Sequence, residues 1–256
     1  MIAVIAMKAV QGLGNTASVY SGGGGSSSSS SPASSSSNLV NLVKFDTKIK
    51  DSLHPCLENV LNIIKSSAKG QIAANIQKFS GEIPGWNWGL IEGNLPTNVN
   101  GNTKSVISSD GFIYTTIDYN KLKNATILGS AAVIIHESIH AYLTVYFAND
   151  PINANKDYPG MLNAWYISHD INAIQHDQMV ASFIDDIAAS LKQIGISLGL
   201  NLDDQVYQDI AWGGLDFENN SQLSDDDKER IQNRLSAEQT SSAYRNEFPS
   251  STKTCN

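Results

Sequence analysis

The spacing of hydrophobic residues changes along this chain, and each spacing predicts a different kind of element. From Leu53 onward, apolar residues recur every three or four positions up to about Ala68, which is the spacing of an amphipathic helix. Pro55 suits the first turn of this helix, and Ser52 is its expected cap. A second helix is predicted to follow, carrying Ile72, Ile76 and Phe79 and closing before Gly81.

The spacing becomes two at residues 112–119, which read FIYTTIDY and are mostly β-branched or aromatic. This pattern predicts a strand. The segment ahead of the strand contains Pro84, Trp86 and Trp88 among glycines and asparagines, and it is predicted to be a loop. We expect the two tryptophans to cover an edge of the core rather than to bind a ligand.

Residues 131–147 are apolar almost without interruption, so they predict a helix that is buried on all sides. Asn124 or Thr126 is its expected cap, and residues 149–160 are predicted to be a loop. Three further helices are predicted. The first ends near Gly195 and has an apolar face made of Ile174, Val180, Phe183, Ile187 and Leu191. The second covers 203–211 and is stopped by Gly213 and Gly214, and the third is charged and solvated, is capped by Ser224 and runs through Leu235.

Two histidines and a glutamate interrupt the apolar helix, at His136, Glu137 and His140. Residues four apart lie on one face of a helix, one turn apart, so both imidazoles can bind the same ion. Buried His and Glu are costly unless they are paired or bound to a metal, which argues against a chance match. A hydrolytic zinc ion takes three protein ligands and a water molecule, whose proton a neighbouring carboxylate can accept. The stretch therefore predicts a Zn²⁺ site with Glu137 as general base.

Residues 136–143, HESIHAYL, resemble the active-site helix of the zincin metallopeptidases. Among these they are most similar to the SprT-like group, whose helix often reads His-Glu-x-Ile/Leu-His-Ala. The resemblance implies a zincin fold, a zinc cofactor and hydrolysis of peptide bonds. It also implies that a strand near this helix is the sheet edge along which a peptide substrate lies. Residues 112–119 are expected to be that edge, with a second, unrecognised strand as the alternative.

The third zinc ligand is expected to be His176, which projects from the same inward face as Val180 and Phe183. A histidine packed in the core without a metal is the alternative reading of His176. His169 is the second candidate ligand. Asp170, Asp177 and Asp185 are weaker candidates, because most aspartates at such positions are solvated. A carboxylate that accepts the other ring hydrogen of a ligand histidine is also expected, but no particular residue stands out.

Composition narrows the possible functions. The 256 residues carry a formal net charge of −8, and a chain without clustered Lys and Arg is not expected to bind nucleic acid. No apolar stretch long enough for a membrane span occurs outside the helix that carries the charged motif, so no membrane association is expected. The expected partner is a protein or peptide substrate.

The ends of the chain differ from its middle in composition. We expect an N-terminal stub at 1–21, a flexible linker at 22–37 that reads GGGGSSSSSSPASSSS, a zincin-like domain at 38–240 and a poorly ordered tail at 241–256. Residues 1–7 are too short for a signal peptide, so the protein could be cytoplasmic or secreted as part of a larger one. Cys56 and Cys255 could pair in an oxidising compartment or remain free thiols.

The expected fold is α+β and zincin-like, mostly helical, with a small sheet packed against the helix of His136 and His140. The expected activity is peptide-bond hydrolysis by metal-activated water. Two alternatives remain: a secreted effector or toxin module that uses the same chemistry, suggested by the linker, and a non-catalytic binding module in which zinc only stabilises the fold.

Overall fold

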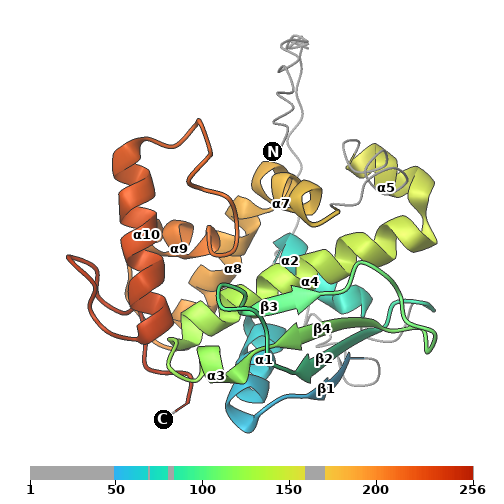
Figure 1. Ribbon diagram of the computed structural model, residues 1–256, viewed down its shortest axis with the longest axis horizontal. Helices are drawn as coiled ribbons and strands as arrows, with labels where there is room; N and C mark the ends of the chain where they lie inside the picture. The colour runs from blue at the N-terminus through green and yellow to red at the C-terminus, as the bar shows by residue number, and fades with distance from the viewer. Residues whose placement is uncertain (1–48, 69, 80–83, 159–170, 256) are drawn as a thin grey trace, which may run out of the picture. The chain divides into compact units, whose positions relative to one another are not determined.

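The computed structural model describes residues 49–68, 70–79, 84–158 and 171–255. The chain divides into two units, 1–41 and 42–256, and all of the described residues belong to the second. The expected stub at 1–21 and linker at 22–37 therefore lie outside the described residues, as do His169 and Asp170. The described residues form helices and one small mixed sheet, which lies at the lower edge in Figure 1, so the predicted α+β class is confirmed.

The sheet has four strands in the order β1-β2-β4-β3. β1 (Ile49–Ser52), β2 (Trp88–Glu92) and β4 (Ile113–Ile117) run parallel, and the short β3 (Gly101–Thr103) pairs with β4 antiparallel. Along β4, Ile113, Thr115 and Ile117 are buried while the residues between them are half-buried, as the predicted alternation requires.

The expectation that 112–119 forms the edge of the sheet is wrong, because β4 is paired on both sides. The edge strand next to β4 is β3, whose three residues are too few to show a strand pattern in the sequence. The predicted loop around Trp88 is also partly wrong, since β2 starts at this residue. Both tryptophans are buried, Trp86 at 6% and Trp88 at 0% exposed, as expected of residues that cover the core.

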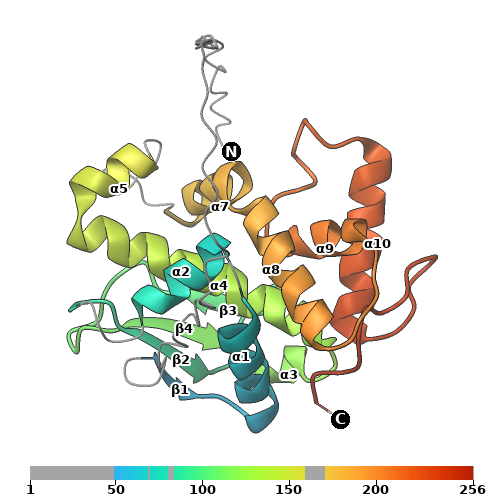
Figure 2. The same ribbon diagram turned by 180° about the vertical axis from the view of Figure 1, so that it is seen from behind.

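The helix with the motif, α4 (Ile127–Asn149), is the centre of this arrangement. Thr126 caps it, since its hydroxyl accepts a hydrogen bond from Gly129 N at 2.9 Å. Figures 1 and 2 both place the sheet below α4 and α7 (Ile171–Ser182) above it. Within the described part of the chain, α4 alone is long and apolar enough to cross a membrane, and 83% of its apolar window is buried in the protein.

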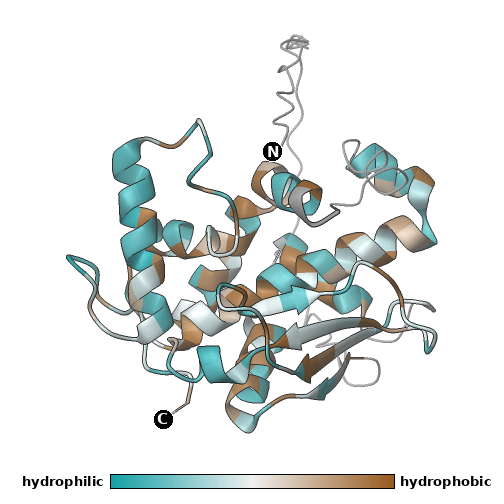
Figure 3. Ribbon diagram, viewed as in Figure 1, coloured by the Kyte–Doolittle hydropathy of each residue, from teal (hydrophilic) through white to brown (hydrophobic). Residues whose placement is uncertain are grey.

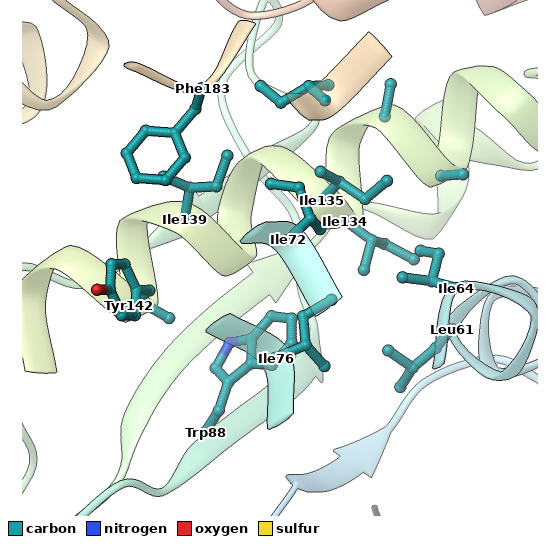
Figure 4. Packing of buried hydrophobic residues seen from close by; sticks show 14 of the residues in the cluster. Leu61, Ile64, Ile72, Ile76, Trp88, Ile134, Ile135, Ile139, Tyr142 and Phe183 are labelled. Atoms are coloured by element: carbon teal, nitrogen blue, oxygen red, sulfur yellow. The ribbon is translucent and has the colours of Figure 1, made fainter. Parts of the chain in front are cut away.

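Two N-terminal helices complete the main core with α4 and the sheet. α1 (Pro55–Ser67) and α2 (Gly70–Lys78) fall where the sequence predicts them. The cap of α1 is His54 rather than Ser52, because Ser52 belongs to β1. Figure 4 shows how the apolar side chains of these helices meet those of α4 and β2; its labelled residues include Leu61, Ile64, Ile72, Ile76, Trp88, Ile134 and Ile139.

The chain after α4 holds more helices than the sequence indicates. The predicted loop 149–160 contains α5 (Pro151–Asp157). The single helix expected over 174–195 is two, α7 and α8 (Ile184–Ser197), with the buried Phe183 between them. α9 (Asp204–Ala211) is close to its predicted range.

The last helix, α10 (Asp225–Thr240), is longer than predicted and not merely solvated. It is largely hydrophilic (Figure 3), and yet Arg234 and Glu238 are buried and form an ion pair at 3.4 Å. The expectation of a solvated face is therefore wrong for the side of α10 that meets α4.

The segment after α10 returns to the body of the domain. Lys253 forms a β-bridge with Thr126, and Thr254 N donates to Ala125 O at 2.8 Å, so this segment lies against the start of α4. Cys255 forms a disulfide with Cys56 in α1. We call residues 250–255 the C-terminal strap.

Candidate metal centre

α4 brings the first two predicted ligands together because they lie one helical turn apart. His136 and His140 are 7% and 4% exposed, and their Nε2 atoms are 3.0 Å from each other. Both imidazoles are therefore removed from water while their nitrogens face the same point.

α7 supplies the third imidazole. His176 Nε2 lies 3.1 Å from His140 Nε2, and one nitrogen of each of the three rings lies within 4.8 Å of the others. Asp177 and Asp185 are exposed and do not join this group. Of the candidate ligands within the described residues, the structure brings together His136, His140 and His176, and this cluster could hold a metal ion.

The donor atoms fit a zinc ion. Zn–N bonds of about 2.0–2.1 Å at tetrahedral angles place the nitrogens about 3.3 Å apart, close to the separations of His140 from its two neighbours. Gln175 Oε1 lies 2.5 Å from Nδ1 of His140, and an amide oxygen can only accept a hydrogen bond. The hydrogen of His140 is therefore on Nδ1, and the lone pair of Nε2 points into the cluster.

Burial also keeps these imidazoles in the form that binds metals. Desolvation, with a smaller effect of the neighbouring histidines, holds the pKa of His136 well below its usual value. Desolvation lowers the pKa of His140 to about 3, although the hydrogen bond with Gln175 acts in the other direction. Both rings are therefore neutral at physiological pH and able to coordinate a cation.

Glu137 lies next to the cluster and against β3. It is 4% exposed, and its Oε2 accepts a hydrogen bond of 2.7 Å from the hydroxyl of Thr103. Burial raises the pKa of Glu137 to about 7, while the hydrogen bonds from Thr103 oppose this shift. A carboxyl group with a pKa near neutrality can take up and release a proton at physiological pH.

The histidines and Glu137 line a cavity of about 780 Å³. Most of its walls come from the segment 97–103 that leads into β3, the face of α4, the turn between α9 and α10, and α10 itself, and His176 of α7 adds to them. Gly214 in that turn has a φ of +85°, and a Cβ added there would lie 3.0 Å from Cε1 of His136. The turn at 213–214, where the sequence predicts a helix to stop, therefore packs directly on a histidine of the cluster.

Several residues of the site were not predicted. The partner of His140 is the amide Gln175 rather than the expected carboxylate. Thr103 and Gly101 left no signal, because they belong to the strand that the sequence did not reveal. Gly214 was visible only as a helix stop.

Comparison of the chain with protein-family models, with curated proteins and with solved structures found no match, so the site is interpreted from its own geometry.

Proposed function

We propose that this protein is a zinc-dependent peptidase. The observation that carries the proposal is the meeting of three imidazoles and a buried carboxylate in the wall of one cavity. His136, His140 and His176 would hold the ion, and Glu137 would act as general base. The resemblance of residues 136–143 to the zincin active-site helix supports the same assignment.

Each residue has a definite part in this chemistry. Zinc supplies a nucleophile at neutral pH, because it lowers the pKa of a bound water molecule to about 7. Glu137 accepts the proton of the attacking water and returns it to the departing amine, which a carboxyl group with a pKa of about 7 can do in both directions. Gln175 keeps the lone pair of His140 directed at the ligand position.

The edge strand supports a peptide as the substrate. Lys104 N donates to Tyr114 O, and Asp118 N donates to Asn100 O, so the even-numbered positions of this segment pair with β4. By the alternation of an antiparallel ladder, Gly101 and Thr103 turn their backbone groups away from β4. An extended peptide could add to this edge, beside Glu137.

A zinc ion that only stabilises the fold is the main alternative. Such sites have four protein ligands and no open position. Within the described residues this cluster has three histidines, and it borders a cavity large enough for part of a substrate. These two features favour a catalytic centre.

The disulfide favours an oxidising compartment as the place of action. Disulfides between structural cysteines persist in secreted and periplasmic proteins and are rare in cytosolic ones. Of the two locations considered for this chain, export is therefore the one we propose, and an exported peptidase is compatible with an effector role.

The proposal is tested by zinc content and peptide cleavage in matched variants. We expect the wild-type protein to contain one zinc ion per chain by plasma mass spectrometry and to cleave members of a peptide library, as followed by mass spectrometry. Glu137→Gln should keep its zinc and lose about 10²–10⁴-fold in kcat, because only the proton acceptor is removed. His176→Ala should lose zinc, whereas His169→Ala should keep it.

The outcomes separate the alternatives. Zinc in the wild type without any cleavage would contradict the peptidase assignment and leave a structural ion. Cleavage that survives Glu137→Gln would contradict the role of Glu137 as general base. A wild-type protein without bound metal after purification in the absence of chelators would contradict the metal centre itself.

A further inference from the structure

A general base must hold one carboxylate oxygen where it can take a proton, and a hydrogen bond from β3 orients the carboxylate of Glu137. Its two oxygens lie in different surroundings. Oε2 accepts the hydrogen bond from the Thr103 hydroxyl, whereas Oε1 lies over Gly101, where an added Cβ would be 2.8 Å away. The oxygens are therefore distinguished by β3.

The hydroxyl of Thr103 is the end of a hydrogen-bond chain that crosses the sheet. Trp88 Nε1 in β2 donates to Thr115 Oγ1 in β4 at 2.9 Å. Thr115 Oγ1 lies 2.6 Å from Thr103 Oγ1 in β3, which in turn lies 2.7 Å from Oε2 of Glu137. The chain thus links three neighbouring strands to the carboxylate on α4.

The chemistry of the indole sets the direction of this chain. An indole nitrogen can donate a hydrogen bond but cannot accept one. Thr115 is fully buried, and Thr103 is its hydroxyl's available acceptor among the described residues, so Thr115 donates to Thr103. The hydrogen of Thr103 is then left for Glu137. Thr103 has only one hydrogen to give, and both of its acceptors belong to Glu137: the carboxylate Oε2 at 2.7 Å and, farther away, the backbone carbonyl oxygen at 3.2 Å.

The strand register makes this contact possible. Thr103 pairs directly with Thr115 across the β3–β4 ladder, and residues directly opposite each other on one face have adjacent side chains. Gly101, two positions before Thr103, faces the same side and also meets Glu137. A Cβ at Gly101 would lie 2.8 Å from Oε1 and 2.7 Å from Cγ of Glu137. At these two positions, β3 therefore binds one oxygen and leaves space for the other.

We propose that Thr103 is a positioning residue for Glu137, oriented by Thr115 and Trp88, and that it fixes the orientation in which the carboxylate accepts a proton. The inference rests on the role proposed for Glu137 above. It extends the proposed active site by Thr103, Thr115 and Trp88, which touch neither the metal ligands nor the substrate's reacting atoms. It also explains why β3 lies so close to α4.

The test compares Thr103→Val, which removes the hydroxyl at nearly constant volume, with Thr103→Ser, which keeps it. In the zinc-loaded enzyme we expect Thr103→Val to lower kcat about 10- to 100-fold, as is typical of lost outer-shell hydrogen bonds, while KM and zinc content stay unchanged. Thr103→Ser should restore most of kcat. Thr116→Val is the matched control, because Thr116 lies on β4 but on the opposite face from Thr115, and we expect wild-type kinetics from it.

A second readout does not depend on activity. In a crystal structure of Thr103→Val we expect the carboxylate of Glu137 to turn from its wild-type orientation, with the three histidines unmoved. An unturned carboxylate, a kcat of Thr103→Val within twofold of wild type, or a Thr103→Ser variant as slow as Thr103→Val would each overturn the inference. If the wild-type enzyme cleaves no peptide, the proposed function fails, and the orientation of Glu137 still tests the positioning role.

Discussion

Gln175 connects His140 to the rest of the protein through both ends of its amide. Its oxygen lies 2.5 Å from His140 Nδ1, and its nitrogen donates to Thr144 Oγ1 at 3.3 Å. Because Thr144 lies on the same helix as His140, one amide holds the imidazole relative to its own backbone. The tautomer of His140 is therefore determined before any ion binds.

Replacing Gln175 with leucine should weaken zinc binding without removing a ligand. We expect Gln175→Leu to lower the affinity for zinc about 10- to 100-fold, because His140 loses the acceptor that orients it. Competition with a chromophoric chelator measures this change. Gln178→Leu is the control, since Gln178 lies on the same helix but bonds to Ser182. Equal affinities of Gln175→Leu and wild type would show that the amide has no part in metal binding.

The site could be predicted at the residue scale only where side-chain type and spacing coincide. His136 and His140 stand out because a charged motif interrupts an apolar helix, and His176 because it shares a face with Val180 and Phe183. Gln175 has no such signature, because an amide in a helix is ordinary. Thr103 acts through its neighbours in the sheet, which only the folded chain brings together.

At the scale of elements, α10 illustrates how a charged helix becomes part of the site. Asp227 and Ser224 form a capping box at its start, and Arg230 also bonds to Asp227 at 2.6 Å. Further along, Glu238 lines the cavity and accepts a hydrogen bond from Ser250 N in the C-terminal strap at 3.0 Å. The cap thus determines where a helix that borders the site begins.

The cap should make stability depend on pH in acid. The hydrogen bonds from Ser224, and then those from Arg230, lower the pKa of Asp227 to about 2. A folded pKa below the unfolded one stabilises the folded protein above about pH 4, and this contribution is lost as the pH falls to about 2. We expect Asp227→Asn to have a lower Tm than wild type at pH 7, and the difference to narrow towards pH 2.

Asp226→Asn is the control for this comparison, because it removes the same charge from the same helical turn without touching the capping box. If the Tm falls by the same amount in both variants at pH 7, the loss of stability comes from the negative charge of the first turn and not from the capping box.

The sequence predicted long elements with a regular apolar pattern better than short or irregular ones. α1, α2 and α4 have long periodic patterns, and their ranges agree with the sequence-based prediction to within a few residues. β3 is three residues long, and α5 begins at a proline in a segment rich in Asn and Asp. The break between α7 and α8 falls at a buried Phe183, where the apolar spacing continues and tertiary packing decides the backbone.

At the scale of the whole molecule, the disulfide between Cys56 and Cys255 joins residues 199 positions apart. Cross-links that close long loops restrict the unfolded chain most. We expect the double variant Cys56→Ser, Cys255→Ser to lose about 2–5 kcal/mol in the free energy of unfolding, measured with a chemical denaturant. The wild-type protein treated with a reductant should match the double variant, and equal stability of oxidised and reduced wild type would contradict the expectation.

The contact between the C-terminal strap and the start of α4 has a consequence for the order of events during synthesis. Ser130 Oγ lies 2.6 Å from Thr254 Oγ1, across 124 positions of sequence. At about 5–20 residues per second, a ribosome needs roughly 6–25 s to add that many residues. For this interval the nascent chain already contains His136 and His140 but lacks the residues that hold the first turn of their helix. We therefore expect the first turn of α4 to reach its final contacts only after the strap has been translated.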